Sequence, residues 1–184
     1  SHYGGCTTAT LWVTNVSSAD AVNYRCLVTG GCGSATSSAP ALTLKAATTV
    51  TGQPSAQNVC AGVTTNFSVA ASGDGTLTYQ WQTNGVNISN GSHYGGCTAA
   101  TLWVTNVSSA DAVNYRCVVS GGCGTPTPSV GAALTLKVGT TITQQPSSQT
   151  VSAGGTANLS VTATGEGVLT YQWRKDGTNV TEGG

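Results

Sequence analysis

The sequence predicts an all-β fold of small β-sandwich domains in tandem, with about seven strands in each domain. The chain is rich in Gly, Ser and Thr and contains no Met. Short runs in which apolar and polar residues alternate recur between turn signals, as strands of a sandwich do. Nearly the same stretch also occurs twice, because residues 1–26 and 92–117 differ only at Thr8 and Ala99. Such a repeat is typical of a domain array.

One complete repeat runs from about residue 46 to residue 137, and its strands follow in order. Pro54 and the run 57–59 indicate an edge strand, where proline is tolerated. Alternation predicts strands over residues 65–71 and 77–81, and the Asn84-Gly85 pair after the second predicts a tight turn. The remaining strands are predicted from Leu102 to Val107, from Val113 to Cys117 and from Leu134 to Leu136.

This division leaves part of a repeat at each end. We expect a C-terminal half-domain over residues 1–45, a complete domain over 46–137 and an N-terminal half-domain over 138–184. Each half would expose a hydrophobic face and open sheet edges. Two interpretations stay open: a window on a longer continuous array, or a protomer whose tail half completes the head half of the next one. Both predict an unbranched filament.

Composition argues against several functions. The chain has six Lys or Arg and six Asp or Glu, so its net charge is zero. A nucleic-acid partner or an anionic membrane would favour a basic surface, and no apolar run is long enough to insert in a membrane. The sequence shows no catalytic triad, phosphate-binding loop or C-x-x-C metal pair, so we expect no enzyme, no metal and no cofactor. Seven Cys indicate an oxidising, extracellular or cell-surface location.

Three motifs then point to a family. Leu-Thr-Tyr-Gln-Trp occurs at 77–81 and 169–173, Leu-Trp-Val-Thr-Asn-Val at 11–16 and 102–107, and Asp-Ala-Val-Asn-Tyr-Arg-Cys at 20–26 and 111–117. In this order they resemble the immunoglobulin superfamily, specifically the tandem immunoglobulin-like, I-set-like repeats of large bacterial surface proteins. The resemblance implies strand C core tryptophans and E–F corner tyrosines, which are here Trp81, Trp173, Tyr24 and Tyr115.

The resemblance also assigns strands E, F and G to residues 1–45, and strands A, B and C to residues 138–184. The sequence departs from the family pattern at Val69, because strand B usually has a cysteine at that position. The usual inter-sheet disulfide is therefore missing. As a hypothesis, Cys97 pairs with Cys123, and Cys6 pairs with Cys32. A pair of Cys60 with Cys117 stays open, and Cys26 is interpreted as a free core thiol.

Several surface residues are candidates for contacts. Trp12 and Trp103 should face outward on strand E, either to meet a neighbouring strand or sugar ring or to shield their own sheet. Tyr3 and Tyr94, beside His2 and His93, are expected in a solvated loop that could also line a contact. Asp20 and Asp111 should cap backbone amides. Candidate glycosylation sites in Asn-x-Ser/Thr sequons are Asn15, Asn66, Asn87, Asn90, Asn106, Asn158 and Asn179.

The function that follows is a structural extracellular filament or cell-surface stalk built of tandem immunoglobulin-like repeats. Its expected partners are copies of itself or neighbouring repeats of the same polypeptide, in head-to-tail order. The alternative is an adhesin or carbohydrate-binding module that uses the exposed tryptophans, with glycans as partners. An array of nearly identical domains favours the structural role, because the fold alone does not define a function.

Overall fold

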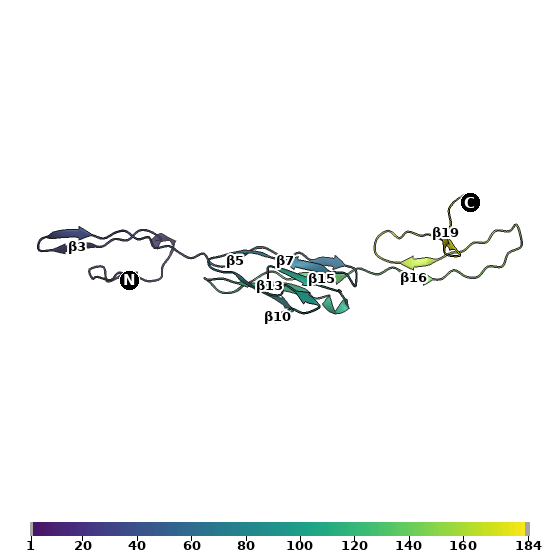
Figure 1. The fold of residues 1–184 in the computed structure, drawn as a ribbon, viewed down its shortest axis with the longest axis horizontal. Helices are drawn as coiled ribbons and strands as arrows, with labels where there is room; N and C mark the ends of the chain where they lie inside the picture. Colours follow the sequence, from purple (N-terminus) through teal and green to yellow (C-terminus); the bar gives the residue numbers. More distant parts are fainter. Residues whose placement is uncertain (1, 183–184) are drawn as a thin grey trace.

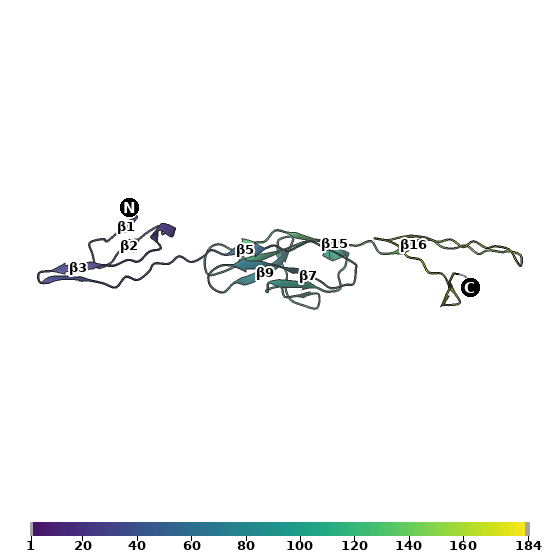
Figure 2. The ribbon, with the colours of Figure 1, turned by 90° about the horizontal axis from the view of Figure 1, so that it is seen from above.

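The computed structural model describes residues 2–182, and within them regular structure consists of β-strands and two short 3-10 helices. Figures 1 and 2 show an elongated molecule with three parts in a row. We name them by the predicted boundaries: the head half (residues 2–45), the central domain (46–137) and the tail half (138–182). The boundaries themselves stay a prediction.

The central domain is a two-layer β-sandwich. One sheet has the order β10-β9-β13-β15-β6, with β14 beside β13; the other has the order β11-β12-β7; and β5 pairs with β8. All pairings are antiparallel except that of β15 with β6. The bounds are β5 Thr49–Gly52, β6 Gln57–Val59, β7 Thr65–Ser68, β8 Ala70–Ser72, β9 Thr78–Thr83, β10 Val86–Asn87, β11 Tyr94–Gly95, β12 Thr101–Val104, η2 Ser109–Asp111, β13 Asn114–Ser120, β14 Thr127–Pro128 and β15 Ala132–Leu136.

Alternation along the strands builds the core of this domain. In β7, Thr65 and Phe67 are buried while Asn66 and Ser68 are exposed, because successive side chains point to opposite faces. The predicted turn at Asn84-Gly85 forms, with both residues at positive φ (48° and 84°), as a type I′ hairpin turn needs. The structure thus confirms the all-β sandwich that the sequence predicts.

Aromatic residues occupy the centre of the core. Trp81 and Tyr115 are fully buried, and Phe67 stacks on Tyr115 with ring centroids 4.7 Å apart and planes inclined by 19°. The Trp81 indole N–H donates to the Ala99 carbonyl at 2.9 Å, so its polar atom is satisfied inside the sandwich. Val69 lies in the same core at the position of the missing strand B cysteine. The core is therefore held by packing and hydrogen bonds, with no disulfide among the described residues.

The two halves contain only local pairings. The head half has β1 Tyr3–Gly4 paired with β2 Trp12–Val13, η1 Ser18–Asp20, and the hairpin of β3 Leu27–Gly30 with β4 Gly33–Thr36. The tail half has β16 Thr141–Gln144 paired with β17 Thr162–Thr164, and β18 Arg174–Lys175 paired with β19 Thr178–Asn179.

These local pairings repeat those of the central domain. Tyr3 faces Val13 as Tyr94 faces Val104, and the β16–β17 pair carries the same register shift as the β5–β8 pair. The expected strand around Trp173 is shorter than predicted and starts only at Arg174. A strand needs a neighbour for its backbone groups, and in the central domain β13 supplies that neighbour.

Candidate functional site

A cluster around Asp111 closes one end of the central domain. His93 Nε2 lies 2.6 Å from Asp111 Oδ1, and the Tyr94 hydroxyl donates to the same oxygen at 3.4 Å. The other carboxylate oxygen accepts from the backbone amide of Ser108 at 2.8 Å and from its hydroxyl at 2.9 Å. Asp111 therefore caps the backbone as the sequence predicts. Through its hydrogen bond from Tyr94, it also links β11 to the turn before β13.

The expectation of a solvated loop is wrong for Tyr94, whereas His93 lies in the bend just before β11. Tyr94 belongs to β11 and is half-buried, and its ring packs edge-on against His93. The corner tyrosine Tyr115 adds a further tie, because its hydroxyl donates to the Asp111 carbonyl at 3.3 Å. The head half repeats the cluster, with His2 Nε2 2.6 Å from Asp20 Oδ1. Sequence reasoning missed these pairs, although the same His-to-Asp spacing in both repeats was a signal.

Burial and hydrogen bonds oppose each other in setting the pKa of Asp111. Burial of the carboxylate favours its neutral form, but hydrogen bonds from His93 and Ser108 outweigh it and lower the pKa below the usual 3.8. The pKa of Asp20 is lowered as well, first by the bond to His2 and then by Ser17. The chemistry fits a structural clamp that stays ionised, not an acid that donates protons near neutral pH.

Trp103 presents an aromatic surface on the outside of the second sheet. It is 48% exposed, between Leu102 and Val104, which are both fully buried. Across the strands it faces Gly95 on β11 and Asn66 on β7. A bulky ring beside a glycine shields backbone that has no side chain of its own. Trp12 faces Gly4 in the same way and is 65% exposed. Both tryptophans thus point outward as predicted.

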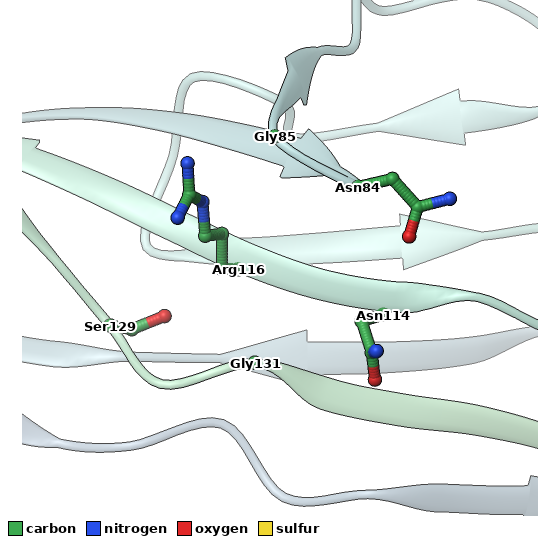
Figure 3. Close-up of a pocket in the computed structure, with 6 residues that line it drawn as sticks. All are labelled: Asn84, Gly85, Asn114, Arg116, Ser129 and Gly131. Atoms are coloured by element: carbon green, nitrogen blue, oxygen red, sulfur yellow. The ribbon is translucent and has the colours of Figure 1, made fainter.

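A polar hollow of about 460 Å³ lies on the outside of the larger sheet. Figure 3 shows its lining: Asn84, Gly85, Asn114, Arg116, Ser129 and Gly131. Arg116 donates through Nε to Gln82 at 2.8 Å, and the Ser129 hydroxyl accepts the Cys117 amide and donates to the Val130 carbonyl. Since these groups already have protein partners, the hollow does not show a built ligand site.

Open apolar faces dominate both ends of the molecule. The head face surrounds a hollow of about 440 Å³, with Cys6, Leu11, Tyr24, Cys26 and Leu27 among its lining residues. The tail face surrounds a hollow of about 370 Å³, with Ile142, Val161, Leu169, Tyr171 and Trp173 among its lining residues. Trp173 is 40% exposed where its counterpart Trp81 is fully buried, and Leu11 is 43% exposed where Leu102 is fully buried. The residues that are exposed at the two ends thus correspond to buried core residues of the central domain.

The seven cysteines are separate thiols in the structure. Cys97 is fully buried, and its carbonyl accepts the Trp81 amide at 2.9 Å. Cys123 is half-buried at the domain end, where its carbonyl accepts the Thr48 amide. The predicted Cys97–Cys123 and Cys6–Cys32 pairs stay predictions. Cys117 is buried in the core, whereas Cys6, Cys26, Cys32 and Cys60 are exposed.

The predicted glycan acceptors all lie at exposed positions. Asn66 is the acceptor beside Trp103, and the remaining acceptors are Asn15, Asn87, Asn90, Asn106, Asn158 and Asn179. Over residues 2–182, no group of three or more His, Cys, Asp or Glu could hold a metal ion. A search of the same residues for a long apolar helix that could cross a membrane finds none.

The sandwich, its strand C tryptophan and its tyrosine corner define the class: the chain contains immunoglobulin-like domains. Residues 49–121 match the family described as Immunoglobulin domain, and residues 140–184 match the family described as Immunoglobulin I-set domain. An I-band fragment of titin, I67–I69, has a similar fold, with a TM-score of 0.58 and 19% identity over 95% of this chain and 62% of that chain.

Curated relatives match over most of the chain. Peroxidasin homolog of Mus musculus is 26% identical over 174 residues, which are 95% of this chain and 12% of the relative. Roundabout homolog 1 of Rattus norvegicus is 30% identical over 180 residues, 91% of this chain and 11% of the relative. The chain thus spans about a tenth of the length of these relatives. They are animal proteins, so they give no support to the bacterial part of the resemblance.

Proposed function

We propose that this chain is a segment of a structural extracellular filament or cell-surface stalk, in which immunoglobulin-like domains follow one another in a line. The observation that carries the proposal is the tandem repeat, because residues 1–26 and 92–117 differ only at Thr8 and Ala99, in an elongated molecule whose parts lie in a row (Figure 1). A protein that bears load or holds distance needs such end-to-end continuity. Catalysis would need a set of reactive groups, and the clamp at Asp111 holds its groups in structural hydrogen bonds.

Labelling of intact cells that make the protein tests this function. Antibodies against the central domain should bind without permeabilisation, and immunogold should follow fibres or stalks. An impermeant amine reagent should modify Lys45 and Lys137 on the same cells. Binding of the antibody only after permeabilisation would contradict the proposed location and role.

The second candidate is an adhesive or carbohydrate-binding role, favoured by the exposure of Trp103 and Trp12 on equivalent strands. Flat aromatic faces outside a sheet suit the apolar faces of sugar rings. A glycan array probed with the chain and with Trp103→Ala and Trp12→Ala separates the roles. Glycan binding by the parent chain that disappears in the two variants supports adhesion. No binding by the parent chain leaves the structural role as the function.

A further inference from the structure

We propose that one acidic loop in each repeat binds the linker that enters the repeat, and that Glu166 extends this contact to the preceding domain and holds the junction at residues 137–138. The acidic loop is Gly-Asp-Gly at 73–75 and Gly-Glu-Gly at 165–167. Its partner is the neighbouring domain of the same chain. The inference rests on the tandem order of domains in the proposed function and adds the contact that makes a junction between them stiff.

The acidic loop of the central domain holds the entering linker through a reciprocal pair of hydrogen bonds. The Ala46 amide donates to Asp74 Oδ2 at 2.6 Å, and the Asp74 amide donates to the Ala46 carbonyl at 3.1 Å. The Asp74 carbonyl also accepts the Gly122 amide at 2.7 Å, which ties the loop to the turn after β13. Because one residue satisfies both backbone groups of Ala46, the linker has a fixed path at this point.

Glycines allow the loops to close around the linker. Thr48 is buried, its amide donates to the Cys123 carbonyl at 3.2 Å, and its carbonyl accepts the Thr127 hydroxyl at 3.0 Å. A Cβ at Gly121 would lie 2.4 Å from the Thr48 hydroxyl oxygen, and a Cβ at Gly73 would lie 2.9 Å from the Thr48 Cα. Residues with side chains at these two positions would push the linker out of its site.

The tail half makes the same contact one repeat later. The Val138 amide donates to Glu166 Oε2 at 3.3 Å, and the Glu166 amide donates to the Val138 carbonyl at 3.2 Å. Gly165 again allows a close approach, since its Cβ would lie 2.8 Å from the Thr140 hydroxyl oxygen. The reciprocal pair forms with aspartate in one repeat and with glutamate in the other. It is therefore a feature of the repeat and does not depend on one loop sequence.

Glu166 adds a bond that crosses the junction. Its other oxygen, Oε1, accepts from the side-chain amide of Asn58 at 3.3 Å, and Asn58 lies on β6 of the central domain. The linker runs beside the same strand, because the Lys137 amide donates to the Val59 carbonyl at 2.9 Å. A glutamate is one methylene longer than an aspartate and accepts through two oxygens. One side chain can thus hold the linker and the preceding domain together.

This contact should limit bending at the junction. Domains on a short linker move relative to each other unless a contact between them prevents it. Hydrogen bonds to a carboxylate are among the stronger ones, but Glu166 is exposed, so we expect the contact to order the junction and to add little to the stability of either domain. Figure 1 shows the tail half following the central domain in line, as a stiff junction requires.

Distances between two spin labels in the full chain test the contact. Nitroxides on noncanonical residues at Val86 in β10 and Thr162 in β17, both exposed positions, report the distribution of distances across the junction. Glu166→Ala should broaden this distribution at least about twofold, because both side-chain bonds of Glu166 are lost. Asp74→Ala is the matched control at the other acidic loop and should leave the width unchanged. Equal widths in Glu166→Ala and the parent chain would overturn the inference.

Two milder variants separate the bond across the junction from the bond to the linker. Asn58→Ala removes the donor on β6, and Glu166→Asp shortens the side chain to the length that holds Ala46 in the central domain. Both should broaden the distances, yet both should keep the Val138 amide protected from hydrogen exchange. Glu166→Ala should speed exchange of that amide at least about tenfold. Glu166→Asp with the parent's distance distribution would overturn the role of the longer side chain.

The outcome is independent of the test of the proposed function. Labelling of intact cells reads where the protein lies, and the distance distribution reads how one junction moves. A protein that is labelled at the cell surface but bends as freely as its Glu166→Ala variant would overturn this inference and leave the proposed function in place.

Discussion

His93 Nε2 and Asp111 Oδ1 are 2.6 Å apart, and this one contact joins the residue just before the short strand β11 to the corner that precedes β13. The usual inter-sheet disulfide is absent at Val69, so polar ties of this kind and the aromatic core hold the sandwich together. His2 and Asp20 form the same contact in the head half. The chain therefore carries its own control for each change in the clamp.

Removal of the clamp histidine should destabilise the central domain. His93→Ala deletes a charge-assisted hydrogen bond at a partly exposed site, and we expect a loss of about 1 kcal/mol in the free energy of unfolding. Urea unfolding of the full chain at neutral pH measures it. His2→Ala, the matched change in the head half, should leave that transition of the dilute chain unchanged. Equal effects of both changes would contradict a local clamp.

Low pH should destabilise the central domain through protonation of Asp111. The pKa of Asp111 is lowered by its hydrogen bonds from His93 and Ser108, and a carboxylate with a depressed folded pKa stabilises the fold above its unfolded pKa, near 3.8. That stability is lost as pH falls from about 4 through the lower folded pKa. Asp111→Asn should flatten this dependence in unfolding measured between pH 7 and 2. A slope identical to that of the parent chain would contradict the assignment.

The stability that is lost when a leucine is truncated to alanine should depend on the burial of that leucine and not on its sequence motif. Leu102→Ala opens a cavity at a fully buried position and should cost about 2–5 kcal/mol. Leu11→Ala alters the same motif in the head half, where the side chain is 43% exposed, and should leave unfolding of the dilute chain within about 0.5 kcal/mol of the parent. Urea denaturation compares the two directly. A large effect of Leu11→Ala in dilute solution would show a packed head half.

The buried thiol of Cys117 should not react with alkylating reagents while the central domain is folded. Burial raises the pKa of Cys117 from the ordinary thiol value of 9.0 to about 11. A raised thiol pKa means that stability is full below pH 9 and falls as pH rises toward 11. Alkylation at pH 8 should spare Cys117 and Cys97 until urea unfolds the chain, while Cys60 reacts at once. Rapid native labelling of Cys117 would contradict the packing around Trp81.

A glycan on Asn66 would lie beside Trp103, its cross-strand neighbour. If the site is occupied in the native protein, the first sugar can rest on the exposed indole, and the glycan should stabilise the domain by about 0.5–1 kcal/mol through that contact. Thermal unfolding before and after enzymatic deglycosylation measures the effect, and Trp103→Ala should abolish it. Bare asparagine in site-resolved glycopeptide masses would remove this role.

Much of the fold could be predicted because its signals are local. Alternation around Phe67 and Trp81 defines which face is buried, and the Asn84-Gly85 pair defines a hairpin turn. The strand at Trp173 could not be predicted correctly from the same motif, because strand length depends on a neighbouring strand distant in the sequence, as β13 is from β9 in the central domain. The motif favours an extended strand, but the strand forms only where a neighbouring strand can pair with it.

The surface sites were less predictable. The outward position of Trp103 follows from strand alternation, and the capping role of Asp111 follows from its place after a strand exit. The bond from His93 joins residues far apart in sequence, and a Gly-rich stretch around them is typical of a loop. The burial of Cys97 was not predicted either, because its carbonyl accepts the amide of Trp81, a residue 16 positions earlier in the chain.

Hydrogen exchange of residues 1–26 and 92–117 tests the central claim most directly. The two peptides differ only at Thr8 and Ala99, so their intrinsic exchange rates match and their masses distinguish them. If the central domain is the packed sandwich described above, residues 92–117 exchange slowly, whereas residues 2–26, where Leu11 is 43% exposed, exchange fast. Equally fast exchange of the two peptides would contradict the packing of residues 92–117 in the central sandwich.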